Sequence, residues 1–102
     1  MAKKNKTFEL WDDFLDKRLQ DPEYAAAYLT ECYADEDKTV FLIALMDVIR
    51  AREKKVSAIA KKSKMNRQSV HRMLSKKGNP RWTNLATLMD TIGIRLNFSL
   101  PA

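Results

Sequence analysis

The sequence predicts a mainly α-helical protein, a bundle of five or six helices that ends in one short β-strand. Its 102 residues include only two glycines and three prolines. So few turn-forming residues disfavour a sandwich or barrel, which needs a tight turn about every 8 to 12 residues. Apolar residues recur at steps of three and four along most of the chain, which indicates amphipathic helices, and they alternate only near its end.

Two helices are expected in the first third of the chain. The first covers residues 8–19, where apolar residues form one stripe at helical spacing. The second begins at Pro22, because Asp21 is a favourable N-cap residue and proline fits the first turn of a helix. It runs to about Ala34, and the acidic cluster at 35–37 ends it and caps the next helix.

The third helix is expected from Val40 to about Glu53. Nine of the ten residues from Val40 to Ile49 are apolar, and Asp47 is the exception. A helix with one solvent-exposed face would carry more polar residues, so we expect this helix to be covered from several sides. A buried strand is the alternative, but an uninterrupted run without Gly or Pro favours one long helix.

Three short helices and a strand follow. The expected N-caps and helices are Ser57 for 58–62, Asn66 for 67–75 and Thr83 for 84–91. Gly93 occupies the position that ends the last helix. Beyond it, apolar and polar residues alternate with a period of two, which is typical of a strand with one apolar face. The apolar positions of this strand are Ile94, Leu96, Phe98 and Leu100.

We expect these elements to form a single domain of residues 1–102. Within it, residues 1–37 form acidic helices, residues 38–94 form a helix-turn-helix core, and residues 95–102 form the C-terminal strand. No linker rich in Gly, Ser or Pro separates these parts. The long third helix is expected to join the acidic and basic parts in one core.

The net charge of +6 conceals two parts of opposite charge. Residues 7–37 hold ten acidic and two basic residues, whereas residues 38–102 hold fourteen basic and three acidic residues. A concentrated basic surface attracts a polyanion, because each neutralised phosphate releases condensed counterions. A solvated basic face, or attraction between the two parts of the chain, would explain the same pattern. The acidic part suggests a second, cationic partner.

Residues 56–74 match the spacing of a helix-turn-helix of the phage-repressor type. Ile59 faces inward, Ala60 lets the second helix approach closely, and Met65 fills the turn. Val70 and Met73, followed by Leu74, form the inward face of the second helix. Any helical hairpin shares some of these features. The interpretation as a DNA-binding motif therefore depends on the residues on the outward face of the second helix.

The outward face of the second helix carries side chains suited to a DNA major groove. Arginine reads guanine and glutamine reads adenine through paired hydrogen bonds. We therefore predict base contacts from Arg67, Gln68 and Arg72, with Ser69 and His71 beside them. A solvated polar face is the alternative. The basic residues expected to hold the DNA backbone are Lys61, Lys62, Lys64, Lys76, Lys77 and Arg81.

Several short stretches between Asp21 and Asn97 resemble one known family. They are Asp21-Pro22-Glu23-Tyr24, Ala27-Tyr28-Leu29, Phe41-Leu42, Ala44-Leu45, Asp47-Val48, Ile59-Ala60, Asn66-Arg67, Met73-Leu74-Ser75, Gly78-Asn79-Pro80-Arg81 and Ile92-Gly93-Ile94-Arg95-Leu96. The sequence is similar here to the helix-turn-helix antidote proteins of prophage-type addiction modules, which are relatives of the Hig-type antitoxins. The resemblance implies a protein that neutralises a small cationic toxin of the RelE and ParE type and represses its own operon.

The sequence departs from that family at two positions where glycine is common. These positions are occupied by Glu53 and Lys64. A left-handed backbone at Lys64 would cost about 1 to 2 kcal/mol, so the turn is either strained or built differently. This departure affects the expected docking angle on DNA more than the motif itself.

The two protein partners are expected at different surfaces. The acidic residues predicted to attract the toxin are Asp12, Asp13, Asp16, Glu31, Asp35, Glu36 and Asp37. The strand has no partner in a helical chain, so we expect a homodimer in which two strands pair through Ile94, Leu96, Phe98 and Leu100. Addition of the strand to the toxin's sheet, or a frayed tail, are the alternatives.

We expect neither enzymatic activity nor a bound cofactor or metal. The chain has one histidine, His71, and no phosphate-binding loop or paired metal-ligand spacing. A single cysteine, Cys32, excludes an internal disulfide, and a cytoplasmic location without membrane insertion is expected. Two other functions stay open: a phage-type repressor without a toxin, and a pure protein inhibitor whose helix-turn-helix is only a scaffold.

Overall fold

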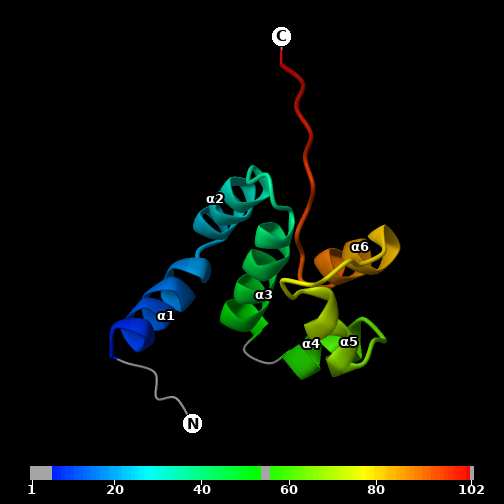
Figure 1. The fold of residues 1–102 in the computed structure, drawn as a ribbon, viewed down its shortest axis with the longest axis horizontal. Coiled ribbons are helices and arrows are strands. Elements are labelled where there is room, and N and C mark those ends of the chain that lie inside the picture. The colour runs from blue at the N-terminus through cyan, green and yellow to red at the C-terminus, as the bar shows by residue number, and fades with distance from the viewer. Residues whose placement is uncertain (1–5, 54–55, 102) are drawn as a thin grey trace.

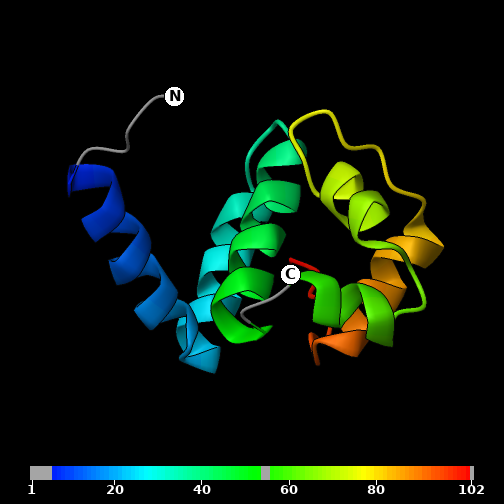
Figure 2. The same cartoon turned by 90° about the horizontal axis from the view of Figure 1, so that it is seen from below.

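The computed structural model describes residues 6–53 and 56–101, with only the backbone of residues 6–12 and 53. The helices in this part of the chain are α1 (Lys6–Leu19), α2 (Pro22–Tyr33), α3 (Thr39–Glu53), α4 (Val56–Lys62), α5 (Arg67–Met73) and α6 (Trp82–Thr91). In both views, α1 and α2 lie on one side of α3, and α4 to α6 lie on the other (Figures 1 and 2). The mainly helical prediction is confirmed.

The centre of the fold is α3. It contacts α1 and α2 on one side and α4 on the other. Its buried side chains are Phe41, Leu42, Ala44, Leu45, Val48, Ile49 and Ala51. The exception in this apolar run, Asp47, accepts hydrogen bonds from the Tyr28 hydroxyl at 2.8 Å and from Arg50 Nη2 at 2.5 Å. The expectation of a long helix covered from several sides is therefore confirmed.

The C-terminal end of α3 is fastened to the corner between α1 and α2. Arg52 Nη1 donates to the carbonyl oxygens of Leu19 at 3.4 Å and Gln20 at 3.0 Å. In return, the Gln20 side-chain amide donates to the carbonyl of Ala51. These carbonyl groups at the end of α1 lack partners within their helix, so a cation there satisfies them and favours the helix dipole.

Among the expected N-caps, Asp21 and Asn66 are confirmed, and Ser57 and Thr83 are wrong. The Asp21 carboxylate accepts from the Glu23 amide at 3.1 Å, and the Asn66 side chain accepts from the Ser69 amide at 2.7 Å. However, α4 begins one residue before Ser57, because burial of Val56 in the core outweighs capping. Likewise, α6 begins one residue before Thr83. Its N-cap residue is Arg81, which forms no side-chain capping bond.

The predicted C-terminal strand is wrong for the single chain. Residues 94–100 have no regular secondary structure, and within the described residues no other segment offers them a strand edge. A strand needs a neighbouring backbone for its N–H and C=O groups, and an all-helical chain supplies none. The last apolar side chains are consequently exposed, Phe98 at 87% and Leu100 at 92%. We call residues 95–101, which extend away from the helices in Figure 1, the tail.

In the described part of the chain, no helix has both the length and the apolar character needed to cross a membrane.

Candidate nucleic-acid interface

The helices α4 and α5 pack against each other as a hairpin on the side of α3 that is opposite α1 (Figure 1). Ile59 of α4 and Val70 of α5 are fully buried, and Ala60 and Met73 are nearly so. Burial at these positions is what the helix-turn-helix spacing predicted. Since one side of α5 lies in the core, its opposite side must face outward.

The turn between α4 and α5 has a left-handed residue at Lys64, with φ of 58°. The Met65 amide donates to the Ala60 carbonyl at 2.8 Å, and the Lys64 amide donates to the Lys61 carbonyl at 3.2 Å. This pair of bonds is a Schellman motif, which normally has glycine at the left-handed position. Of the two alternatives for this turn, the strained one is therefore observed.

The end of α6 has the same motif with the usual residue. The Ile94 amide donates to the Met89 carbonyl at 2.8 Å, and the Gly93 amide donates to the Asp90 carbonyl at 3.1 Å. Gly93 has φ of 82°, which confirms its expected role in ending the helix. The chain thus holds two equivalent turns, one with glycine and one with lysine.

The α4–α5 turn is fastened to α6 by a hydrogen bond that the sequence did not reveal. Ser63 is buried, and its hydroxyl donates to the Thr91 hydroxyl at 3.1 Å. The Thr91 hydroxyl in turn donates to the Thr87 carbonyl at 2.7 Å. Ser63 stands between Lys62 and Lys64, a context typical of a surface residue. Nothing in the sequence indicates that its side chain is buried. The bond fixes the hairpin relative to α6.

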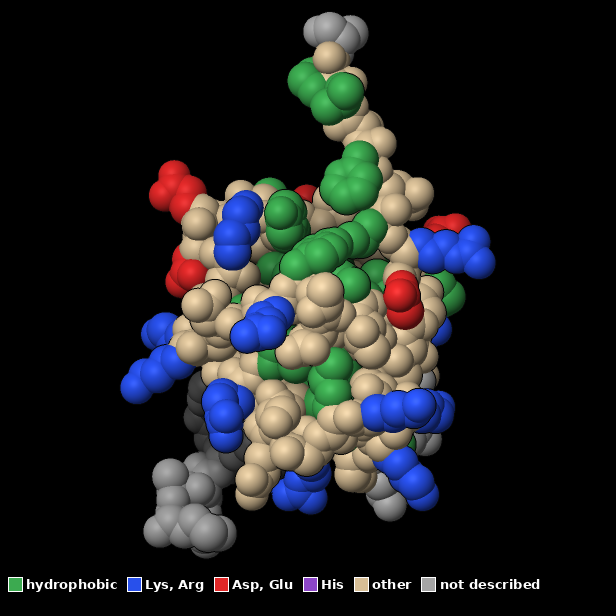
Figure 3. Space-filling view, turned by 90° about the vertical axis from the view of Figure 1, so that its right-hand side faces the viewer, with side chains coloured by type: hydrophobic (Ala, Val, Ile, Leu, Met, Phe, Trp, Pro, Cys, Tyr) green, Lys and Arg blue, Asp and Glu red, His purple; other side chains and the backbone are tan. Residues whose placement is uncertain are grey.

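The outward side of α5 carries the side chains predicted to read DNA bases. Arg67, Gln68 and Arg72 are exposed, as is His71, while Ser69 is half-buried. The predicted backbone contacts are also exposed; they are Lys61, Lys62, Lys64, Lys76, Lys77 and Arg81. Figure 3 faces the side formed by α4 to α6 and shows Lys and Arg side chains spread around its lower half. Polar α5 side chains and surrounding cations therefore share one accessible region.

The segment between α5 and α6 is packed tightly against the end of α5. The Gly78 amide donates to the Ser75 carbonyl at 2.9 Å. A Cβ atom on Gly78 would lie 2.1 Å from the Met73 carbonyl oxygen, a backbone atom that cannot move aside. Trp82, which follows this segment as the first residue of α6, is 60% exposed.

The acidic residues predicted to attract a toxin form two groups instead of one. Asp13 and Asp16 are exposed on α1, whereas Asp35, Glu36 and Asp37 are exposed after the C-terminus of α2. The first group therefore lies on α1 and the second after α2, and the whole of α2, a 12-residue helix about 18 Å long, separates them along the chain. Glu31 is exposed near the second group, and the side chain of Asp12 lies outside the described residues.

Two acidic side chains of the second group also build the α2–α3 turn. The Asp35 carboxylate accepts from the Asp37 amide at 2.9 Å. The Asp37 carboxylate accepts from the Thr39 amide at 3.0 Å and from the Thr39 hydroxyl at 2.7 Å. These hydrogen bonds from Thr39, with a smaller contribution from Lys76, lower the pKa of Asp37. Both carboxylates thus have a structural role whatever they bind.

Burial raises the pKa of the Cys32 thiol, and the carboxylates of Asp47, Asp35 and Glu31 add to the effect. A thiolate is the reactive form of cysteine, so Cys32 is poorly suited to nucleophilic chemistry. Among the side chains that the structure describes, no cluster of three or more His, Cys, Asp or Glu residues could hold a metal ion.

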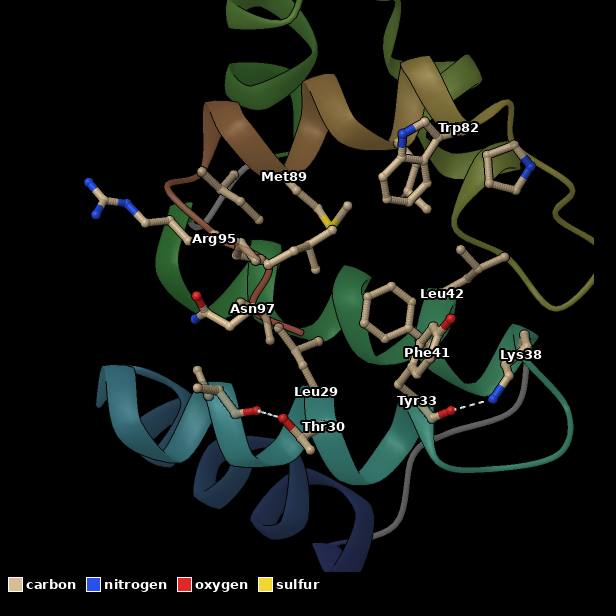
Figure 4. Close-up of a pocket in the computed structure, with 18 of the residues that line it drawn as sticks. Leu29, Thr30, Tyr33, Lys38, Phe41, Leu42, Trp82, Met89, Arg95 and Asn97 are labelled. Atoms are coloured by element: carbon tan, nitrogen blue, oxygen red, sulfur yellow. Dashed lines mark hydrogen bonds between the residues drawn. The ribbon is translucent and has the colours of Figure 1, made fainter. Parts of the chain in front are cut away.

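An apolar groove lies between α2 and α3 on one side and α6 on the other, and its volume is about 1050 Å³. Residues 95–98 of the tail form part of its wall. Figure 4 shows Met89 projecting from α6, with Leu29 on α2 and Phe41 and Leu42 on α3 across the opening. Sequence reasoning missed this groove, although the alternating apolar residues of the tail signalled a surface in need of cover.

Comparisons with known proteins place the chain among antidote proteins. A family model described as "Probable addiction module antidote protein" matches residues 9–100. An uncharacterised protein of Haemophilus influenzae is 28% identical over 89 residues, which cover 87% of this chain and 90% of that protein. No solved structure matches the chain.

Proposed function

The chain belongs to the family of probable addiction module antidote proteins, and from this premise we propose that it is the antitoxin of a type II toxin–antitoxin module. In this proposal it neutralises a small cationic toxin of the RelE and ParE type, binds operator DNA sequence-specifically and represses its own operon. The observation that carries the proposal is the family match over residues 9–100, since an antidote implies a toxin of some kind.

For DNA binding, the α4–α5 hairpin serves as a helix-turn-helix of the phage-repressor type, with α5 as recognition helix. The support is geometric: burial of Val70 and Met73 turns Gln68 and Arg72 outward, and Arg67 is exposed at the first position of α5. These side chains read base edges in the major groove, and Ser69 and His71 lie beside them. The exposed cations on α4 and on both turns hold the phosphates and set the position of α5 without reading sequence.

For toxin binding, the two acidic groups attract a basic protein and speed its encounter with the antitoxin. They lie on α1, α2 and the α2–α3 turn, whereas the DNA-reading helix lies on the other side of α3 (Figure 1). The two partners thus use different sides of the molecule. A homodimer completes the proposal, because two copies present two recognition helices about 34 Å apart, one turn of DNA.

Two substitutions test the DNA part. Arg72→Ala removes a base-reading side chain and is expected to reduce the preference for the operator over unrelated DNA by about 1 to 3 kcal/mol. Lys61→Ala removes a phosphate contact and should weaken binding to all DNA duplexes alike. The slope of the logarithm of the binding constant against the logarithm of the salt concentration should fall in magnitude by about one. Fluorescence anisotropy with the DNA upstream of the gene, at several salt concentrations, measures both. The reverse result would show that the roles are wrongly assigned.

Co-expression tests the toxin part. A neighbouring gene for a small basic protein is expressed alone and together with this chain. The proposal expects growth to stop in the first case and to recover in the second, with the two proteins purifying as a complex. DNA binding without any such rescue would identify a plain repressor. Rescue without salt-dependent DNA binding would identify a pure inhibitor.

A further inference from the structure

The apolar groove is a large surface that the described chain leaves open. It is lined by side chains of α2, α3 and α6, among them Leu29, Phe41 and Met89. Tyr33 stands at its wall with 57% of its surface exposed, and its ring packs edge-on against Phe41 at 5.4 Å between centroids. Apolar surface of this extent is typical of sites that receive another polypeptide.

The tail, whose first four residues line one wall of this groove, exposes further apolar side chains: Leu96 at 46%, Phe98 at 87% and Leu100 at 92%. Leu96, Phe98 and Leu100 alternate with polar residues, so they share one face of an extended segment. Within the described residues, the last backbone hydrogen bond is donated by Ile94, and none is recorded for the tail. The tail's seven residues extend over about 23 Å at about 3.3 Å each, which is the width of two packed helices.

We propose that the apolar groove is the docking site for the tail of a second copy of this chain. The two tails run antiparallel across a two-fold axis, and Phe98 of each copy lies in the groove of the other. The tail begins at the groove's own wall, so both contacts form at once when the copies meet. This inference deepens the proposed homodimer, on which it rests, by naming the surface that receives each tail.

Charge favours a second copy over a cationic toxin as the occupant. The charged residues lining the groove are Lys38, Arg52 and Arg95 against Asp37. A groove with that balance repels a basic protein, whereas Leu96 to Leu100 carries no charge. A second copy also covers the groove and the tail of both chains together, because the same patch faces itself across a two-fold axis.

The test is the mass of the full chain in solution, followed over a range of concentrations by analytical ultracentrifugation. The wild type is expected to be a dimer. Phe98→Ala should raise its dissociation constant on the order of a hundredfold, because truncating a buried aromatic ring weakens binding about tenfold and the symmetry counts it twice. Ser99→Ala is the matched control, since Ser99 lies on the other face of the tail and should leave the dimer unchanged.

Tyr33→Ala tests the groove from the receiving side and should also weaken the dimer. Both residues are exposed in the single chain, so unchanged circular dichroism confirms that the variants stay folded. A wild-type dimer that Phe98→Ala and Tyr33→Ala leave intact would overturn the groove inference while the homodimer stands. A wild type that is monomeric at every concentration would overturn both, and the co-expression experiment would still decide the antitoxin function separately.

Discussion

Lys64 occupies a backbone position that glycine would fill at lower energy. Its φ of 58° places it in the left-handed region, where the Cβ atom crowds the following carbonyl oxygen. Hydrogen bonds on both sides of Lys64 stabilise the turn. The Ser63 hydroxyl donates to the Thr91 hydroxyl, and the Met65 amide donates to the Ala60 carbonyl. A lysine here adds a cation to the candidate DNA surface at the expense of stability.

Lys64→Gly is therefore expected to stabilise the fold by about 1 kcal/mol. Gly93→Ala, at the equivalent position after α6, should destabilise it by about 1 to 2 kcal/mol, although no atom lies within 4 Å of the added Cβ. Urea unfolding of both variants measures the free energies. Equal stability of wild type and Lys64→Gly would show that the left-handed turn carries no strain.

Tyr28 makes stability depend on alkaline pH. Burial, with the hydrogen bond to Asp47, raises the pKa of Tyr28 well above its usual value near 10. The folded state thus holds this proton more tightly than the unfolded state. The resulting stability is fully present below about pH 10 and is lost as pH rises above it. Tyr28→Phe should unfold with a flatter pH dependence above pH 10.

A matched control has to separate the Tyr28–Asp47 hydrogen bond from the mere replacement of a tyrosine by phenylalanine. Tyr33→Phe changes a tyrosine whose ring is largely exposed. Its unfolding free energy should follow the wild type between neutral pH and the alkaline limit. If Tyr28→Phe and Tyr33→Phe give the same alkaline profile, the Tyr28–Asp47 bond does not cause the dependence.

Arg81, at the start of α6, adds a positive charge but stabilises the helix less than a capping residue would. It occupies the N-cap position, forms no side-chain capping bond and places a cation at the positive end of the helix dipole. In the Arg81→Asp variant the new carboxylate should accept hydrogen bonds from the first backbone amides of α6 and stabilise the fold by about 1 kcal/mol. The same change should weaken DNA binding at low salt, as measured by anisotropy. Thr83→Ala, at the second residue of the helix, serves as control and should leave DNA binding unchanged.

The segment from α5 to α6 should tolerate change at Asn79 but not at Gly78. Gly78→Ala places a Cβ atom against the Met73 carbonyl, so we expect a loss of about 1 to 3 kcal/mol from forced displacement of the backbone. Asn79→Ala is exposed and should change stability by less than about 0.5 kcal/mol. Thermal unfolding compares the two. An unaffected Gly78→Ala variant would mean that this segment moves freely relative to α5.

The helices and their order could be predicted because local chemistry determines them. Asp21 and Asn66 cap their helices as expected, since each stands directly before a helix with its side chain free to bond the first amides. The Thr83 prediction is wrong because the extended N-cap residue is Arg81 and α6 starts at Trp82, one residue before Thr83. The strand prediction is wrong because alternating apolar residues indicate one apolar face but do not supply a neighbouring strand for backbone hydrogen bonds.

The candidate site was predictable in part for the same reason. The spacing of Val70 and Met73 determines which side of α5 is buried, so the exposure of Gln68 and Arg72 follows from the sequence. Contacts between distant segments were not predictable. The Ser63–Thr91 bond depends on how the α4–α5 turn meets α6, and the apolar groove depends on how α6 lies relative to α2 and α3. No local pattern encodes these arrangements.

Over the whole molecule, acidic residues predominate on α1 and α2 and basic residues predominate on the α4–α5 hairpin, on the other side of α3. The acidic α1 and α2 and the basic hairpin meet through this helix, and the described ion pair, between Asp47 and Arg50, is local. Lys76 lies near enough to Asp37 to contribute to its lowered pKa. Most charges of both signs therefore face solvent and are available to partners.

Replacing both Asp13 and Asp16 by lysine should slow toxin association, most strongly at low salt, because long-range attraction is lost. DNA affinity should stay the same or rise. Asp90→Lys adds positive charge on α6, away from α1, and is the control for total charge. Stopped-flow association rates at several ionic strengths measure the effect. If the variant with lysine at both positions binds the toxin at an unchanged rate, the toxin-binding surface does not include Asp13 and Asp16.

The position of α3 ties the lifetimes of both proposed activities together. Its apolar surface supports α1 and α2 on one side and α4 on the other, and Arg52 binds the carbonyls at the end of α1. Proteolysis within the first two helices would uncover this surface and remove the acceptors of Arg52. A single cleavage there would disable toxin capture and loosen the support of the DNA-reading hairpin, so cellular turnover would end neutralisation and repression in one event.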